Sequence, residues 1–388
     1  MTEKEKYVRT RSITGEVQVL FRQATLITLY AWFTGWEARP FFRWMTQPQN
    51  LTHAGAGATE IGCFGPNPHV VWEVTSRCNL RCGHCHAFGG ERIIPELNTA
   101  EARSLIKQVA DADIGTFVFT GGEPLLREDL FELIDYARQL RLNVFIATNG
   151  TLITGDIARK LKERAVGVVI GIDAMDARIH DRIRGVEGAL EAAKQGIRNS
   201  SRAGLYLHLN IVATRINLPE VAKVIDYGNQ LGAFSYFIYR FVPIGRGEDV
   251  RQWDLDHEQA LQLIQTVMDK QRTSSAFIIP VAFPEYWAYA AKRRGIRDPK
   301  SVRSLGQYFG GCQAGRGMTY IKPDGDVWAC PFLPTAVGNI KEKSLPEIRG
   351  LLTQYRDSLS IPKCTSCYLE AVCGGCKARP DDGLSCIV

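Results

Sequence analysis

Eleven cysteines are the residues of this 388-residue chain whose types and spacing most directly predict chemistry. Cys78, Cys82 and Cys85 fall within eight residues. Cys63 stands apart, and the last 77 residues hold the other seven: Cys312, Cys330, Cys364, Cys367, Cys373, Cys376 and Cys386. Thiolates at such short gaps are typical ligands of zinc or of iron–sulfur clusters. The spacing therefore predicts two metal sites, separated by a long body without cysteines.

Zinc and iron–sulfur clusters place different demands on these two groups of cysteines. A structural zinc site is closed by four ligands. Between Cys78 and Cys85 there are three thiolates and no obvious fourth, which leaves a coordination position open and disfavours zinc. For the C-terminal group, a pair of zinc sites stays the alternative to iron–sulfur clusters.

Composition and charge favour a cytoplasmic enzyme over a nucleic-acid binder. Residues Met1–Arg11 are polar, and no signal-peptide pattern follows directly, so we expect the protein in the cytoplasm. Thiols stay reduced there, so disulfides do not explain the cysteines. The net charge of +6 is mild and includes no long run of one sign, which predicts no nucleic-acid partner.

The body between the cysteine groups alternates between predicted strands and predicted helices. Strands are expected at Val70–Val74, Phe117–Thr120, Val144–Ala147, Val168–Ile172, Tyr206–Val212 and Tyr236–Phe241. Amphipathic helices are expected at Thr99–Asp111, Arg127–Gln139, Asp156–Arg164, Val186–Arg202 and Leu218–Leu231. Six such units predict a parallel α/β sheet that forms a barrel or part of one.

Polar and glycine-rich residues follow these strands, where the chemistry of such folds is found. The Cys78 group follows the first strand, and Gly121-Gly122-Glu123-Pro124 follows the second. Thr148-Asn149-Gly150, Asp173 and Pro243–Gly247 follow the third, fourth and sixth. Because parallel strands end at one rim, the sequence predicts a cofactor site there.

The segment Cys78–Cys85 reads CNLRCGHC, with the spacing CxxxCxxC. Together with Gly121–Pro124 it resembles the radical S-adenosylmethionine (radical SAM) enzymes, over roughly Pro68 to the C-terminus. The resemblance implies a partial (β/α)6 barrel whose three thiolates hold a [4Fe-4S] cluster, the fourth iron binding SAM. It further implies reductive cleavage of SAM to a 5′-deoxyadenosyl radical that abstracts hydrogen from an unactivated C–H bond. A one-electron donor such as ferredoxin or flavodoxin is then the implied partner.

The same resemblance implies which residues contact SAM. Gly121, Gly122 and Glu123 would receive its amino group, and Arg184 would lie near its carboxylate. Asn149, Asp173 and Asn210 lie where relatives usually contact the ribose or carboxylate of SAM. The segment Pro243–Gly247 resembles the loop beside the adenine. An ordinary strand-end turn or cap is the alternative for each polar residue.

Two features near these residues need separate interpretation. Relatives often have Ser-Leu-Asp-Gly where this chain has Gly171-Ile172-Asp173-Ala174, so a serine hydroxyl is missing from that strand. His84 and His86 flank Cys85, and a histidine ligand would close the position that SAM needs. We therefore expect both histidines to pack or to support the site from outside the cluster.

The C-terminal cysteines resemble those of a SPASM domain, which in relatives binds two auxiliary [4Fe-4S] clusters. Met318–Tyr320 and Val327–Ala329 flank Lys322-Pro323-Asp324-Gly325, which predicts a hairpin that brings Cys312 and Cys330 to one site. The family's pairing assigns four cysteines to an outer cluster, Cys364, Cys367, Cys373 and Cys386, and three to an inner one, Cys312, Cys330 and Cys376. The inner cluster lacks a thiolate, and its fourth iron is either open to substrate or bound by Cys63 or by an oxygen or nitrogen group. A small buried hydrophobe is the alternative role of Cys63.

The N-terminal segment is unusually aromatic. Eight aromatic residues lie between positions 21 and 44: Phe21, Tyr30, Trp32, Phe33, Trp36, Phe41, Phe42 and Trp44. Its uncharged stretch, Ala24–Trp36, is too short to cross a bilayer. Two interpretations stay open, a helix buried against the barrel or an element at a membrane interface with Arg22, Arg39 and Arg43 at its edge. The domains expected are a largely helical extension at 1–66, the barrel at 67–305 and the SPASM domain at 306–388.

Peptide-modifying relatives frequently begin with a small sheet-rich domain that binds the leader of the peptide. The first sixty residues of this chain show no such strand pattern. This favours a hydrophobic or membrane-associated substrate, such as an isoprenoid lipid chain in lipid biosynthesis or a porphyrin. The expected enzyme is an oxidoreductase or forms C–C bonds. Two alternatives are a SPASM-type peptide or protein maturase and an iron–sulfur electron-transfer protein without radical chemistry. The last would have no need of Gly121–Pro124.

Overall fold

A single sheet of ten strands forms the centre of the molecule in the computed structural model, which describes residues 24–25, 27–38, 68–306, 311–359 and 367–379. The strand order is β10-β9-β8-β1-β2-β3-β4-β5-β6-β7. Neighbours from β8 to β7 run parallel, whereas β9 and β10 are antiparallel to the strands beside them. The strands are β1 (His69–Glu73), β2 (Thr116–Thr120), β3 (Asn143–Thr148), β4 (Gly167–Gly171), β5 (Leu207–Ala213), β6 (Ser235–Arg240), β7 (Phe277–Val281), β8 (Met318–Ile321), β9 (Asp326–Trp328) and β10 (Ala336–Asn339).

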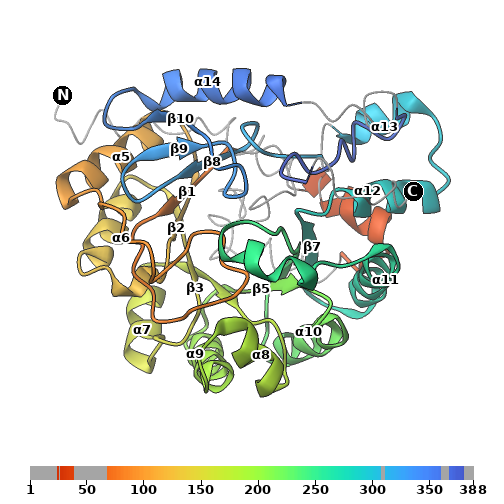
Figure 1. Cartoon of the computed structure of the whole chain (residues 1–388), viewed down its shortest axis with the longest axis horizontal. Helices are drawn as coiled ribbons and strands as arrows, with labels where there is room; N and C mark the ends of the chain where they lie inside the picture. Colours follow the sequence, from red (N-terminus) through yellow and green to blue (C-terminus); the bar gives the residue numbers. More distant parts are fainter. Residues whose placement is uncertain (1–23, 26, 39–67, 307–310, 360–366, 380–388) are drawn as a thin grey trace.

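Helices surround the sheet, with α5 to α11 on its outer side and α14 along the end formed by β8 to β10 (Figure 1). Their buried residues recur at helical spacing, as Ala102, Leu105, Ile106 and Val109 do in α5. The helices are α5 (Thr99–Asp111), α6 (Leu130–Gln139), α7 (Gly155–Glu163), α8 (Ala177–Arg184), α9 (Ala189–Arg202), α10 (Val221–Gln230), α11 (His257–Thr273), α12 (Glu285–Arg293), α13 (Pro299–Gly306) and α14 (Leu345–Ser358), with short 3-10 turns η1 (Pro124–Leu126), η2 (Leu218–Glu220) and η3 (Gly245–Trp253).

The six predicted strands and the partial barrel are confirmed. The predicted helix at Val186–Arg202 begins too early, because Gly185 and Gly188 both adopt left-handed backbone angles and separate α8 from α9. Left-handed glycines commonly end helices. The sequence reading missed α8, whose eight residues include four charged ones and only two large apolar ones.

The predicted C-terminal hairpin is confirmed as β8 and β9, with Tyr320 opposite Trp328 and Gly325 in the turn at a φ of +96°. The sequence did not predict where this hairpin lies. Strand β8 pairs with β1 in parallel, with Ile321 opposite Trp72. The cysteine-rich part of the chain therefore extends the barrel sheet itself, directly beside the strand that leads into Cys78.

The described N-terminal residues lie against β7, the strand at the opposite edge of the sheet. The Tyr30 hydroxyl donates to the Ile278 carbonyl and accepts from the Ile278 N–H, both at 2.9 Å. Phe33 and Trp36 are buried, whereas Trp32 is half exposed. An edge strand presents unpaired backbone groups, and Tyr30 satisfies those of Ile278. Burial is thus confirmed for part of the aromatic segment.

The membrane-interface interpretation concerns residues that lie mostly outside the described ranges. None of the described helices is both long and apolar enough to cross a bilayer. Phe21, Phe41, Phe42, Trp44 and the three arginines assigned to the interface lie outside the described residues, as does most of the extension at 1–66.

Replacing Tyr30 by Phe is expected to lower the free energy of unfolding by about 1–3 kcal/mol, because the buried Ile278 N–H loses its partner. The Ile278 carbonyl keeps a second donor, the Gln271 side chain at 2.8 Å. Tyr368→Phe, at a site 40% exposed, is the matched control and should change little. Denaturant unfolding of both variants measures this, and equal stability would mean that the segment does not dock on β7.

Candidate cofactor and substrate site

The first three cysteines lie in the loop that follows β1. Backbone N–H groups point at two of their sulfurs, from Leu80 to Cys78 and from Gly89 to Cys85, both at 3.4 Å. Burial raises the pKa of Cys82 to about 11 and also raises that of Cys78. Metal binding would therefore have to displace protons, as it does for metal-ligating thiols generally.

The spacing of these side chains differs from that of a site for one ion. Within the described ranges, no three His, Cys, Asp or Glu side chains are placed to hold a single metal ion. A [4Fe-4S] cluster spaces its ligands more widely, since each thiolate binds a different iron. Three cysteines on one loop, with backbone donors toward two of their sulfurs, fit that donor set.

Gly121 and Gly122 let the end of β2 approach the chain just before Cys78. A Cβ atom at Gly121 would lie 2.3 Å from the Thr75 carbonyl oxygen, and one at Gly122 would lie 2.2 Å from that of Arg77. Gly121 also has a φ of +139°, which side chains rarely tolerate. The N–H groups of Gly122 and Glu123 donate to those two carbonyls at 2.8 Å. The two glycines thus bring the predicted SAM residues against the cysteine loop.

Glu123 joins the ends of β2 and β3 with a fully buried carboxylate. It accepts hydrogen bonds from the Thr148 hydroxyl at 2.7 Å, the Asn149 N–H at 2.9 Å and the Leu125 N–H at 3.2 Å. Burial raises its pKa to about 6. The Asn149 side chain in turn donates to Asn79, inside the cysteine loop, at 2.8 Å. The structure therefore places Glu123 and Asn149 beside the loop, and their contacts with SAM stay predictions.

Asp173, Arg184 and His84 form a buried group beside Cys82. The Arg184 Nε lies 2.8 Å from the Asp173 Oδ2, and the His84 Nε2 lies 3.5 Å from the same oxygen. Burial alone would raise the pKa of Asp173, but the Arg184 guanidinium and the neighbouring histidines outweigh it and hold the pKa below its usual range. Burial lowers the pKa of His84 to about 4, so His84 is neutral near pH 7.

The same guanidinium lies against Gly171. A Cβ atom at Gly171 would lie 2.6 Å from Arg184 Nη2, so the space of a serine side chain is taken by Arg184. The sequence reading treated Gly171 as a lost hydroxyl contact. In the structure it makes room for the cation that pairs with Asp173 next to Cys82.

Two polar atoms in this region have no partner within the described protein, which fits a ligand site. In the described part of the chain, the Asn210 Oδ1 and the His84 Nδ1 are buried and have no hydrogen-bond partner. Leaving such an atom unsatisfied costs about 1–3 kcal/mol. A polar ligand at the carboxyl ends of β4 and β5 would satisfy them, which fits the hydroxyls and charged groups of SAM.

The loop Pro243–Gly247 braces the cysteine loop through Arg246, a residue the sequence reading did not single out. The Arg246 N–H donates to the Cys85 carbonyl at 3.0 Å, and its Nε donates to that of Cys82 at 3.0 Å. Its Nη1 reaches the Gly89 carbonyl at 3.2 Å. The one available signal was an arginine between two glycines directly after a predicted strand.

Arg246→Gln is expected to weaken retention of the first iron–sulfur cluster, because three hydrogen bonds to the carbonyls of Cys82 and Gly89 are lost. The measurement is the rate of iron release to a chelator under anaerobic conditions. Arg251→Gln, an exposed residue of the same 3-10 segment, is the control. Equal release rates in the two variants would contradict a bracing role for Arg246.

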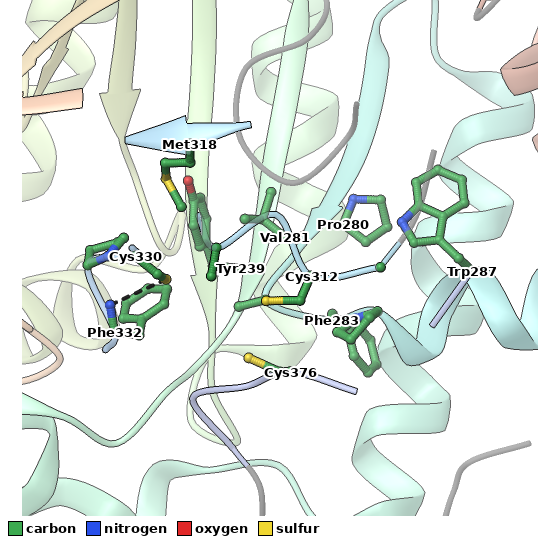
Figure 2. A pocket seen from close by; sticks show the side chains of 15 residues that line it. Tyr239, Pro280, Val281, Phe283, Trp287, Cys312, Met318, Cys330, Phe332 and Cys376 are labelled. Atoms are coloured by element: carbon green, nitrogen blue, oxygen red, sulfur yellow. Dashed lines mark hydrogen bonds between the residues drawn. The ribbon is translucent and has the colours of Figure 1, made fainter. Parts of the chain in front are cut away.

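Cys312, Cys330 and Cys376 line one pocket, which confirms that the hairpin brings the first two together (Figure 2). Its other walls are largely apolar and include Tyr239, Val281, Phe283, Trp287, Met318 and Phe332. Among the described residues that line it there is no His, Asp or Glu and no fourth Cys. The three thiols fit three corners of an auxiliary cluster, and Cys63, Cys364 and Cys386 lie outside the described residues.

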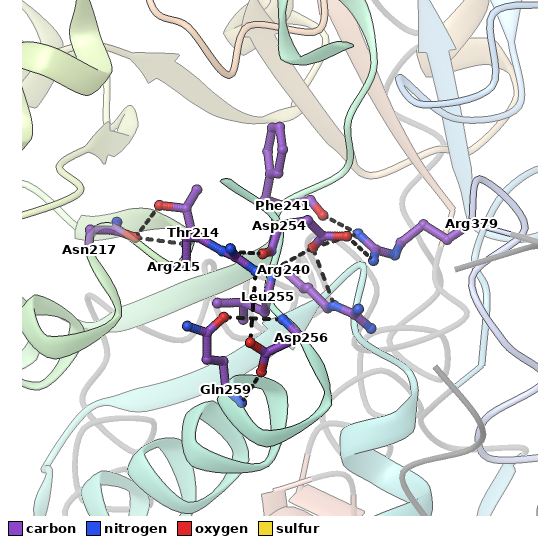
Figure 3. A network of polar contacts seen from close by, with 10 residues as sticks. All are labelled: Thr214, Arg215, Asn217, Arg240, Phe241, Asp254, Leu255, Asp256, Gln259 and Arg379. Carbon is purple, nitrogen blue, oxygen red and sulfur yellow. Dashed lines mark hydrogen bonds and ion pairs between the residues drawn. The ribbon is translucent and has the colours of Figure 1, made fainter. Parts of the chain in front are cut away.

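Arg379 anchors the segment that carries Cys376 to the barrel (Figure 3). It donates to the Phe241 carbonyl at the end of β6, and its Nη2 lies 2.6 Å from the Asp254 Oδ2. The Arg240 Nε lies 3.9 Å from the Oδ1 of the same carboxylate. One carboxylate between two buried guanidinium groups fixes this C-terminal segment against β6.

A polar group, hereafter the junction, connects the two cysteine sites through Glu73, Tyr320 and Lys322, which are buried, and His86, whose side chain is 31% exposed. The Lys322 Nζ lies 2.6 Å from Glu73 Oε2, and the Tyr320 hydroxyl donates to Glu73 Oε1 at 2.5 Å. The His86 Nε2 lies 3.0 Å from the Tyr320 oxygen. Burial lowers the pKa of His86 to about 3 and raises that of Tyr320 well above 10. Sequence reasoning missed the junction because its two halves are more than 200 residues apart.

This arrangement, a cysteine loop at the rim of a partial barrel with a second cysteine pocket beside it, is that of a radical SAM enzyme. The model of the radical SAM superfamily matches residues 72–228, and that of the SPASM iron-sulfur cluster-binding domain matches 312–377. The chain belongs to the radical SAM superfamily and carries a SPASM domain. The first domain binds SAM and a [4Fe-4S] cluster, the second binds auxiliary iron–sulfur clusters, and enzymes of this kind need an electron donor.

Its curated relatives are similar over most of their length. The AdoMet-dependent heme synthase of Oleidesulfovibrio alaskensis is 34% identical over 80% of this chain and 82% of the relative. The mycofactocin maturase MftC of Mycolicibacterium smegmatis is 32% identical, over 80% and 78%. The Fe-coproporphyrin III synthase of Methanosarcina barkeri is 30% identical, over 72% and 73%. Two of these three names specify tetrapyrroles.

Solved structures support the fold. The crystal structure of Streptococcus suis SuiB bound to S-adenosylmethionine matches 85% of this chain and 78% of that chain, with a TM-score of 0.65 and 17% identity. At that identity the likeness concerns the arrangement of elements only.

Proposed function

We propose that the protein generates a radical from SAM and uses it to modify an iron tetrapyrrole at an unactivated C–H bond. The observation that carries this proposal is the apolar pocket that Cys312, Cys330 and Cys376 share with aromatic residues (Figure 2). Tyr239 and Phe332, which are only partly buried, suit a flat ligand that would lie beside the inner cluster. The names of the heme synthase and Fe-coproporphyrin III synthase relatives support the same substrate class.

The first cysteines would hold the cluster that supplies the 5′-deoxyadenosyl radical once SAM is bound. Around it, Gly121, Gly122 and Glu123 would receive the amino group of SAM. Asn149, Asp173, Arg184 and Asn210 would contact its carboxylate and ribose, and the unpartnered Asn210 Oδ1 supports this for Asn210. Asp173 and Arg184 would also orient each other, as their 2.8 Å contact indicates.

The auxiliary clusters would be held by two sets of cysteines. Cys312, Cys330 and Cys376 would bind the inner cluster, and the position of all three on one pocket supports this. Cys364, Cys367, Cys373 and Cys386 would bind the outer cluster. The domains would divide at 66/67 and 305/306, and a ferredoxin or flavodoxin would supply the electron.

The test is an anaerobic assay of the reconstituted protein. Iron and sulfide should each approach about twelve per chain, since each cluster holds about four irons. Strong reduction should yield 5′-deoxyadenosine from SAM. Addition of iron coproporphyrin III should increase this yield and produce a tetrapyrrole of changed mass. If SAM is cleaved but no iron tetrapyrrole tested is bound or altered, the substrate class is wrong.

A peptide substrate is the second candidate, because a mycofactocin maturase is nearly as similar to this chain as the heme synthase. The two are separated by the same assay, run with porphyrins and with candidate precursor peptides. An isoprenoid lipid gains no support from these names. An electron-transfer role without radical chemistry would leave the close packing of Gly121 and Gly122 on the cysteine loop unexplained.

A further inference from the structure

A strongly basic surface covers the turn between α12 and α13 (Figure 1). Between positions 292 and 303, six residues are lysine or arginine and one is acidic, which gives this span a net charge of +5. The whole chain carries +6, so the rest of it is close to neutral. All six basic residues are exposed: Lys292, Arg293, Arg294, Arg297, Lys300 and Arg303.

The molecule does not neutralise these charges within its described part. Asp298, the one acidic residue of the span, instead caps α13, because its carboxylate accepts from the Ser301 N–H at 2.8 Å and from the Ser301 hydroxyl at 2.9 Å. No carboxylate of the described residues forms an ion pair with any of the six. Arg294 donates to the Phe33 carbonyl, which is a neutral group. A patch of this kind attracts partners of opposite charge and speeds their association.

A shallow groove with an exposed tryptophan lies within this surface. Trp32 is 50% exposed and lines the groove together with Ile296, Arg297 and Lys300. Tryptophan and arginine are enriched at the centres of protein–protein interfaces. Insertion into a membrane surface takes several apolar side chains, and Trp32 is the one large apolar residue exposed among the described residues of this groove. The groove therefore suits an acidic protein better than a lipid surface.

Helix α12 connects the basic surface to the SPASM domain. Trp287, near the start of α12, lines the pocket of Cys312, Cys330 and Cys376 (Figure 2). The basic residues begin at the other end of the same helix, with Lys292. Since a helix rises about 1.5 Å per residue, the two positions are about 8 Å apart along its axis. A protein bound to the basic surface would lie at the outer wall of the cysteine pocket.

Helix α13 makes a second connection to the SPASM domain. Gly306, its last residue, packs so closely on the SPASM segment that a Cβ atom there would lie 2.4 Å from the Ala371 carbonyl oxygen. Ala371 is two residues from Cys373. Both helices that carry the basic charges thus contact the part of the chain that holds the C-terminal cysteines.

We propose that the basic surface, formed by residues 292–303 and Trp32, is the docking site of an acidic one-electron carrier protein. This inference rests on the proposed function, since it concerns the electron that radical formation requires. The carrier would be oxidised by one electron and a cluster at the cysteine pocket reduced by one, with no bond formed or broken. Nucleic acid and anionic membranes match the charge as well, but neither supplies an electron.

The test measures the affinity of the anaerobically reconstituted protein for an acidic flavodoxin and for an acidic ferredoxin. The wild type should bind at least one of them, about tenfold more weakly at about 0.5 M salt than at about 0.05 M, because salt screens exposed charges. Phosphatidylglycerol vesicles and duplex DNA are titrated in parallel as alternative partners.

Charge reversal localises the binding. Arg297→Glu/Lys300→Glu should weaken carrier binding at low salt on the order of tenfold and slow the reduction of the protein by the carrier. Lys160→Glu/Arg202→Glu is the matched control, because it makes the same change of charge at exposed positions of α7 and α9. This control should bind the carrier as the wild type does.

Two further measurements protect the test against misfolding. Arg297→Gln/Lys300→Gln removes the charges without reversing them and should weaken binding less, about threefold. With dithionite in place of the carrier, all variants should form 5′-deoxyadenosine at the wild-type rate, because the basic surface lies outside the SAM site.

The outcomes separate this inference from the function beneath it. Equal carrier affinity in the two charge-reversal variants, or no binding of either carrier to the wild type, would overturn the docking site while dithionite-driven cleavage of SAM still stands. The same holds if charge reversal weakens binding to vesicles or DNA but not to the carriers. If the fully loaded wild type forms no 5′-deoxyadenosine even with dithionite, the proposed function fails and this inference fails with it.

Discussion

Cys82→Ala is expected to abolish the cleavage of SAM and to remove about four irons per chain, leaving the auxiliary clusters in place. The reason is the position of the residue. Cys82 is the middle cysteine of the loop after β1, and it lies beside Arg184 in the buried group that includes Asp173 and His84. A cluster held by three protein thiolates should not survive the loss of one, and without it SAM cannot be reduced. The yield of 5′-deoxyadenosine and the iron content measure both effects.

Cys312→Ala is the control for this prediction. It should remove iron from the pocket shared with Cys330 and Cys376 and leave SAM cleavage without substrate near its wild-type rate. The two cysteine variants therefore have opposite expected results. If Cys82→Ala still forms 5′-deoxyadenosine, or if both variants lose the same cluster, the division of the cysteines between two sites is wrong.

Glu73→Gln is expected to lower the free energy of unfolding by about 3–5 kcal/mol, because it leaves the Lys322 ammonium buried without a counter-charge. Glu73 and Lys322 are 1% and 5% exposed, and their charged atoms are 2.6 Å apart. Water cannot replace the lost partner at this depth. The change also removes the charge that the Tyr320 hydroxyl contacts, so the whole junction weakens. Denaturant unfolding under anaerobic conditions measures the loss.

The double variant Glu73→Gln/Lys322→Met should recover most of that stability, since no unpaired charge stays buried. The exposed ion pair of Lys107 and Asp111, with its charged atoms 2.7 Å apart, is the matched control. Asp111→Asn should cost less than about 1 kcal/mol, because water screens this pair. A similar cost at both sites, or no recovery in the double variant, would show that burial does not govern the junction.

Local patterns in the sequence were enough to predict the barrel. Strands such as β1 and β3 are short apolar runs, and α5 has a regular apolar face and a capping box at Asn98. These features depend on neighbours a few residues away, so they can be read directly. The same approach missed α8, where charged residues outnumber large apolar ones, and it placed the start of α9 too early across Gly185 and Gly188.

The residues of the SAM site could be predicted from the sequence, but the contacts among them could not. The motif CxxxCxxC and the residues Gly121–Glu123 identify the chemistry, because the ligands and the glycines are contiguous. What Glu123 contacts is not readable from the motif. Its partners, the Thr148 hydroxyl and the Asn149 N–H, follow a different strand, and only the alignment of β2 with β3 brings them within hydrogen-bond distance.

By itself, the sequence determined the number and spacing of the cysteines, the alternation of strands and helices, and the membership in a family that cleaves SAM. Tertiary structure alone decided that β8 pairs with β1, and so that Glu73 meets Lys322 and Tyr320 and that His86 lies beside Phe332. The physical reason is separation along the chain. A strand near residue 70 and one near residue 320 each show an apolar pattern, but neither pattern indicates which other strand is its partner. The register of the whole sheet decides which buried residues meet.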